Sequence, residues 1–200
     1  GRRDQTLINA SAIGYYGSRG DEVLSEASAP GSGFLSDVTS AWEASAASAA
    51  DVARVVILRF GIVLAGDGGA LPEMARPFSW LVGGPLGSGR QWLSWIDRGD
   101  LIRLVQWVIS NQRAAGVYNA TSPNPVRNDD FTRTLASVLH RPALFRVPAF
   151  ALRRVLGREK AEALLLFSDR VVPRRAIDEG FEFLFSDLRV SLERAFGRSD

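Results

Sequence analysis

Cysteine is absent from this 200-residue sequence, and histidine and lysine occur once each, as His140 and Lys160. Without cysteine, disulfide bonds, thiolate metal sites and cysteine nucleophiles are excluded. A single histidine leaves only carboxylates as further metal ligands. A serine hydrolase triad would have to use His140, and no G-x-S-x-G nucleophile motif accompanies it. The sequence therefore argues against a hydrolase and predicts no metal site.

Long apolar runs are also absent, because none reaches the length that spans a membrane. The sequence thus predicts a cytoplasmic protein with no membrane partner. The sequence also has no large excess of either charge, since 24 basic and 22 acidic residues give a net charge of +2. Nucleic-acid binding favours basic residues clustered on one face, and this small excess gives no reason to expect a nucleic-acid partner.

Short apolar runs alternate with helical patterns along the chain. Thr6–Ile13 is a short apolar run of the kind that forms a buried parallel strand, and Ala53–Phe60, rich in β-branched residues, predicts a second buried strand. Val117–Ala120 predicts a third strand. The alanine-rich segment Phe34–Ala50 predicts a helix between the first two strands. This order predicts an α/β fold with a parallel sheet. The C-terminal part is expected to be mainly helical, with one strand at Phe181–Phe185.

Gly14, Gly17 and Gly20 follow the first predicted strand with glycine spacing that suggests a dinucleotide-binding fingerprint. In that motif a helix begins directly after the glycines, and its N-terminus binds the pyrophosphate. Here the next segment is Asp21–Gly33, which is rich in serine, proline, glycine and acidic residues. An acidic loop repels an anion, so we interpret these glycines as a turn.

A second glycine-rich segment, Gly83–Leu101, joins a turn to a short aromatic strand and a helix. Trp92–Ile96 predicts the strand, and Asp100 predicts the N-cap of the helix. Arg90 and Trp92 lie beside the glycines, where a polar or aromatic ligand can be bound. The alternative is a surface loop between a packed strand and a packed helix, and the sequence leaves both interpretations open.

Ser11 and the pair Tyr15 and Tyr16 lie near the carboxyl end of the first predicted strand, where α/β sheets bind ligands. A serine hydroxyl and a phenol at this edge can polarise and protonate a carbonyl oxygen. Ser11 and Tyr15 are therefore candidate catalytic residues. The alternative, two tyrosines that pack a loop, also stays open.

Five segments carry a resemblance to a known family: SAIGYYG, LRFGIVLAGDGGALPEM, GPLGSGRQWLSWI, GVYNATSPNPV and PRRAIDEGFEF. In this order they resemble the nucleoside-diphosphate-sugar epimerase-like family of atypical extended short-chain dehydrogenases/reductases. The last segment resembles that family's C-terminal domain of unknown function. The resemblance implies the C-terminal part of an NAD(P)-binding Rossmann fold at residues 1–140 and a small, mostly helical subdomain at residues 141–200. It also implies NADP as cofactor, with NAD as the alternative, and a small-molecule substrate.

The resemblance also implies roles for individual residues. Ser11 matches the serine that ends the family's fifth strand, beside the nicotinamide. The segment that lines the cofactor in the family is matched by Phe60, Gly61, Ile62 and Val63. The substrate-side loops of the family are matched by Leu71, Met74, Arg90 and Trp92.

Three departures from the family pattern bear on activity. The Tyr-x-x-x-Lys pair of working dehydrogenases is absent from Phe34–Trp42. Leu93 stands where true epimerases have the arginine that binds a sugar-nucleotide phosphate, and Asp97 stands in place of a histidine. The sequence predicts an NADP(H)-dependent oxidoreductase or epimerase-like protein acting on a small polar or nucleotide-linked carbonyl or hydroxyl substrate. The alternative is a noncatalytic NADP(H)-sensing or interaction module.

Members of this family have a glycine fingerprint and further strands before the segment that matches Thr6–Ile13. We therefore expect this sequence to correspond to roughly the C-terminal two thirds of such a protein, without the strand that binds the pyrophosphate. The resemblance then implies weak or absent NADPH binding by these residues alone. It also implies self-association through Thr6–Ile13, or pairing of that strand with a missing N-terminal segment.

Overall fold

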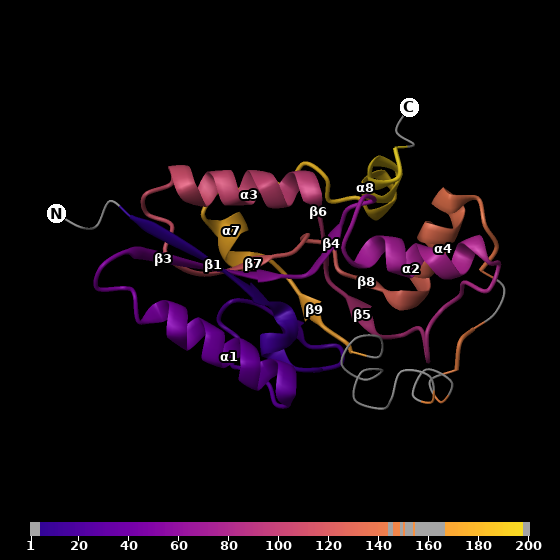
Figure 1. Ribbon diagram of the computed structural model, residues 1–200, viewed down its shortest axis with the longest axis horizontal. Coiled ribbons are helices and arrows are strands. Elements are labelled where there is room, and N and C mark those ends of the chain that lie inside the picture. Colours follow the sequence, from indigo (N-terminus) through magenta and orange to yellow (C-terminus); the bar gives the residue numbers. More distant parts are fainter. Residues whose placement is uncertain (1–4, 144–145, 149, 151–153, 155–166, 198–200) are drawn as a thin grey trace.

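The computed structural model describes residues 5–143, 146–148, 150, 154 and 167–197, and a parallel sheet lies at its centre (Figure 1). The strand order is β1 (Thr6–Ala12), β3 (Arg54–Phe60), β7 (Gly116–Ala120), and neighbouring strands run parallel. Helix α1 (Phe34–Ala47) connects β1 to β3, and α3 (Arg98–Ser110) lies between β3 and β7 in the chain. The predicted α/β fold, with these strands and this first helix, is confirmed.

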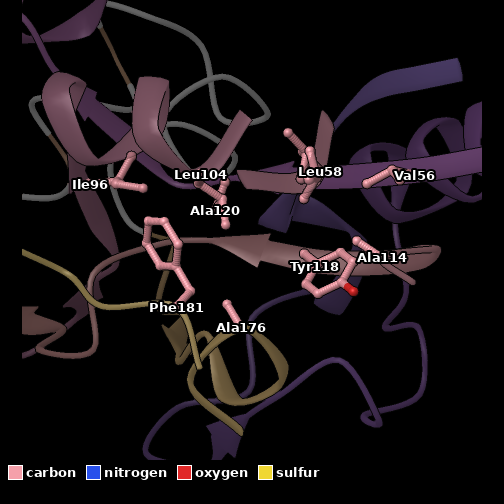
Figure 2. Close-up of a cluster of buried hydrophobic side chains, with 10 residues drawn as sticks. Val56, Leu58, Ile96, Leu104, Ala114, Tyr118, Ala120, Ala176 and Phe181 are labelled. Atoms are coloured by element: carbon pink, nitrogen blue, oxygen red, sulfur yellow. The ribbon is translucent and has the colours of Figure 1, made fainter. Parts of the chain in front are cut away.

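Strand β3 is buried because helices cover both faces of the sheet (Figure 1). Val56 and Leu58 belong to the main hydrophobic cluster on the α3 face, which Figure 2 shows in close-up. Val55 and Ile57 belong to a separate cluster with Ala46 of α1. Alternate side chains of β3 thus pack against α3 on one face of the sheet and against α1 on the other. It also places Arg59 on the α1 face of the sheet.

Short strands surround the central sheet and were not all predicted. They pair as β4 (Ile62–Leu64) with β6 (Trp95–Asp97), β5 (Trp92–Leu93) with β8 (Val126–Arg127), and β2 (Val23–Leu24) with β9 (Arg170–Val171). The prediction of one strand over Trp92–Ile96 is therefore wrong. Its two halves separate at Ser94, whose Oγ donates to the carbonyl of Asp169 at 2.7 Å and accepts from the amide of Val171 at 2.9 Å.

Two further predictions are wrong for one shared reason. The N-cap of α3 is Asp97, whose Oδ1 accepts from the amide of Gly99 at 2.6 Å, and not Asp100. Asp100 is 1% exposed and accepts hydrogen bonds from the amides of Leu184 and Phe185, at 3.0 and 2.8 Å. Because a carboxylate binds these amides, the segment Phe181–Phe185 pairs with no strand of the described structure.

The described residues 167–197 contribute side chains to the same hydrophobic clusters as the rest of the described chain. Figure 1 shows their two helices beside the earlier elements. Helix α7 (Arg174–Asp178) lies against β7. Helix α8 (Leu188–Ala195) packs with α2 (Ala70–Ser79) and α4 (Asn128–Leu139) in a second hydrophobic cluster. A domain boundary at residue 140 stays a prediction. None of the helices in the described part of the chain is long and apolar enough to cross a membrane.

Candidate functional site

A cavity of about 550 Å³ opens at the carboxyl edge of the sheet, beyond the ends of β1 and β3. This is the edge at which open α/β sheets bind their ligands. Its volume lies in the range of small-molecule sites. Most of its lining is apolar. The described lining residues are Ala12, Ile13, Gly14, Leu35, Thr39, Phe60, Gly61, Ile62, Val63, Ala65, Gly68, Gly69, Ala70, Trp92, Leu93, Ser94, Phe167 and Asp169.

Of the five predicted cofactor contacts, Ser11 is not among the described lining residues, and the other four, Phe60, Gly61, Ile62 and Val63, line this cavity. They form the passage from β3 into β4, and the amide of Gly61 donates to the carbonyl of Ala120 at 3.2 Å. A Cβ atom on Gly61 would lie 2.6 Å from the carbonyl oxygen of Ser94, so this passage needs glycine. The structure brings these residues together at one wall, and their role toward a cofactor stays a prediction.

Ser11 and Tyr15 lie beside the cavity and are not among its described lining residues. Ser11 is 4% exposed, and its Oγ donates to Oε1 of Glu43 at 2.7 Å. The guanidinium carbon of Arg59 lies 3.3 Å from the centre of the half-buried Tyr15 ring. Both residues therefore contact a buried polar network, and their catalytic roles stay predictions.

That network joins α1, β3 and β7. Nε and Nη2 of Arg59 donate to the two carboxylate oxygens of Glu43 at 2.8 and 2.6 Å. Nη1 of Arg59 donates to the hydroxyl of Tyr16 at 2.8 Å, and that hydroxyl donates to Oδ1 of Asn119 at 2.7 Å. Burial raises the pKa of Tyr16 to about 12, so its phenol stays protonated at neutral pH.

Sequence reasoning missed Glu43, Arg59 and Asn119. One signal was available, because Arg59 is a charged residue between the apolar run Val55–Leu58 and Phe60 of β3. A buried arginine needs an acidic partner, and the buried face of the neighbouring helix offers Glu43. Nothing in the sequence pattern points to Asn119, whose place follows from the pairing of β3 with β7.

The predicted substrate residues separate into two groups. Arg90 is exposed and is not among the described lining residues of the cavity, whereas Trp92, two residues further on, lines it. The indole Nε1 of Trp92 donates to Asp21 at 2.9 Å. The guanidinium carbon of Arg127 lies 4.1 Å from the Trp92 ring centre, and Nη2 of Arg127 lies 2.7 Å from Asp21. The hydrogen bond from Trp92, with that from Arg127, lowers the pKa of Asp21.

Leu71 and Met74 form the other group. Leu71 is fully buried in the second hydrophobic cluster, and Met74 packs against the same cluster. Neither is among the described residues that line the cavity. Their side chains serve the packing of α2, because the helix buries this face against α4. A direct contact of either side chain with substrate finds no support in this geometry.

Asp169 is the cavity residue that the sequence analysis did not single out. It is 2% exposed, and neither carboxyl oxygen has a hydrogen-bond partner in the described structure. Burial raises the pKa of Asp169 to about 8. No group of three or more histidine, cysteine or acidic side chains in the described residues is placed to hold a metal ion.

Comparisons with known proteins match this chain to a domain family, to other sequences and to solved structures. Residues 147–195 match a family described as a domain of unknown function, DUF1731. The chain is 42% identical, over 95% of its length, to the chloroplastic epimerase family protein SDR39U1 homolog of Arabidopsis thaliana and covers 54% of that protein. It is 39% identical, over 96% of its length, to the epimerase family protein YfhF of Bacillus subtilis and covers 63% of it.

A solved structure matches as well. The crystal structure of human epimerase family protein SDR39U1 (isoform 2) with NADPH superposes with a TM-score of 0.90 at 31% identity. The match covers 98% of this chain and 66% of the human one. Together with the parallel sheet and its cavity, this defines a Rossmann-like α/β protein. The predicted family is confirmed: the chain belongs to the nucleoside-diphosphate-sugar epimerase-like family of atypical extended short-chain dehydrogenases/reductases.

Proposed function

We propose that this protein binds NADP(H) at the carboxyl edge of its sheet and acts as an epimerase- or reductase-like enzyme on a small carbonyl or hydroxyl substrate. The observation that carries the proposal is the cavity, because Phe60–Val63 line it together with Ala12–Gly14 at the end of β1. Its apolar walls fit a flat aromatic ring, and the buried carboxyl of Asp169 can meet a polar substituent. The human relative with NADPH supports the same cofactor.

In this proposal a bound nicotinamide supplies or accepts the hydride, and the protein positions the reactants. Phe60–Val63 hold the ring, while Trp92 bounds the space left for substrate. Arg90 lies on the exposed loop before Trp92 and binds a polar or anionic part of the substrate. Ser11 and Tyr15 orient a carbonyl only if the Ser11 hydroxyl turns away from Glu43, its present acceptor.

A noncatalytic NADP(H)-sensing module is the second candidate, and helix α1 favours it. The described helix Phe34–Ala47 contains no tyrosine and no lysine, so it cannot supply the Tyr-x-x-x-Lys pair. Hydride transfer separates the two candidates, because a sensor binds NADPH without oxidising it.

The test measures NADPH binding by calorimetry, and NADPH oxidation with a panel of carbonyl compounds, in the complete gene product that carries this sequence. Gly68→Trp fills the cavity from a position where an added Cβ meets no atom within 4 Å. We expect it to weaken NADPH binding about tenfold or more. Ala115→Trp, at an exposed position away from the cavity, is the control and should bind normally.

Binding without turnover by the unmodified protein would support the sensor. Turnover with any carbonyl compound would support the enzyme. Equal NADPH affinity of Gly68→Trp and Ala115→Trp would contradict the placement of the cofactor in this cavity.

A further inference from the structure

Asp169 is the only acidic or basic residue among the described residues that line the cavity. Its main chain is held on both sides, since its amide donates to the carbonyl of Trp92 at 3.3 Å and its carbonyl accepts from Ser94 at 2.7 Å. Its carboxyl oxygens, by contrast, bind nothing in the described structure. The residue is thus fixed in position while its functional group stays unpaired at the wall of the cavity.

Other buried carboxylates of this chain are satisfied. Asp97 caps α3, Asp100 binds two backbone amides, and Glu43 binds Arg59. A buried polar group without a partner is costly, and such groups are rare in folded proteins. Because Asp169 lines a cavity large enough for a small molecule, a bound molecule is the partner that the geometry provides for.

The surroundings of Asp169 determine what kind of group it can bind. None of the described lining residues is basic. Arg170 follows Asp169 in the sequence, but its guanidinium carbon lies over the Trp92 ring, 4.5 Å from the ring centre. Burial without a compensating charge keeps the carboxyl protonated at neutral pH, since its pKa is raised to about 8. A protonated carboxyl donates one hydrogen bond, for which an uncharged carbonyl oxygen is a suitable acceptor. An anion would be repelled once the carboxyl ionised.

We infer that Asp169 is a ligand-binding residue of this cavity, and that its carboxyl group donates a hydrogen bond to an uncharged carbonyl oxygen of the bound molecule. The inference rests on the proposed function, because that oxygen belongs either to the carboxamide of the nicotinamide or to the carbonyl substrate. In the second case the hydrogen bond polarises the carbonyl group that receives the hydride.

The test compares Asp169→Asn with Asp169→Leu in the complete gene product. Asparagine donates a hydrogen bond at every pH, whereas leucine donates none. If the carboxamide is the acceptor, NADPH binding by the unmodified protein weakens above pH 8, Asp169→Asn shows no such weakening, and Asp169→Leu binds about five- to tenfold more weakly at pH 7. Calorimetry in buffers of different ionisation enthalpy should also detect proton uptake at pH 8.5, which Asp169→Asn abolishes.

If the substrate is the acceptor, NADPH affinity is the same in all three proteins, and Asp169→Leu instead raises KM for carbonyl substrates. Asp51→Asn, at an exposed position, controls for the loss of a charge. Equal NADPH affinity and equal KM in the unmodified protein and Asp169→Leu would overturn the inference while the proposed function stands. Absence of NADPH binding by the unmodified protein would overturn the proposed function, and with it the inference.

Discussion

Asp100 and Asp169 are both almost fully buried, but only the first has partners. Asp100 accepts from the amides of Leu184 and Phe185 and from Arg103. The two carboxyl oxygens of Asp169 have no hydrogen-bond partner in the described structure. A sequence pattern cannot separate the two, because each environment is built by segments distant in the chain. Arg59 is different, since an arginine that follows the apolar run Val55–Leu58 within a buried strand could have been noticed.

The raised pKa of Asp169 predicts a stability that falls as pH rises. In the unfolded chain this carboxyl ionises near pH 4, whereas in the folded protein it keeps its proton up to about pH 8. Between these two pH values the folded state therefore binds more protons than the unfolded state. The free energy of unfolding is highest below pH 4 and decreases by on the order of 4 kcal/mol by pH 7. Asp169→Asn, which stays neutral, should match the unmodified protein at pH 4 and exceed its melting temperature at pH 8. If the melting temperatures of the two proteins changed equally with pH from 4 to 8, the raised pKa of Asp169 would be contradicted.

The Arg59–Glu43 pair predicts a large loss of stability when one partner is removed. Arg59 is 3% exposed, and Arg59→Met leaves the Glu43 carboxylate buried with no cation. We expect a loss of about 3–5 kcal/mol in urea unfolding, and partial recovery in the double variant Arg59→Met, Glu43→Leu. The control is Asp67→Ala, which breaks an exposed pair with Arg98 and should cost less than about 1 kcal/mol. Equal losses in the two single variants would contradict a buried pair.

At the scale of the element, strands that are continuous and apolar could be predicted and the short ones could not. The run at β3 carries its own signal, because helices bury both faces of this central strand. The run at β1 was expected to be buried as well, but most of this strand is exposed or half-buried because no strand of the described structure covers its outer edge. Strands β5 and β6 lie within a single apolar run, and they separate only because Ser94 binds the backbone around β9. Strand β9 has two residues and depends on β2 for its pairing. A short strand that forms only by pairing with a distant segment cannot be predicted from its own residues.

At the scale of the whole molecule, the position of the cavity follows from the sheet, but one part of its lining comes from a segment that the order of the sequence does not indicate. The segments after β1 and β3 meet at the carboxyl edge, as parallel strands require, so much of the lining could be predicted. Phe167 and Asp169 reach the same cavity from more than a hundred residues further along the chain. Their arrival depends on contacts of β9 with β2 and Ser94, which no local pattern encodes.

The same sheet predicts self-association of these 200 residues when they are prepared alone. Strand β1 pairs with β3 on one side and with no strand of the described structure on the other, and Leu7 on it is 37% exposed. An open edge of this kind presents unpaired amides and carbonyls to a second chain.

Sedimentation velocity should detect larger species as concentration rises. Ala10→Lys, at an exposed position of β1, should reduce them because an edge charge opposes strand pairing, whereas Ala115→Lys, at an exposed position outside the strands, should not. A single monomeric species at every concentration, with tight NADPH binding by the isolated chain, would show that this edge needs no partner.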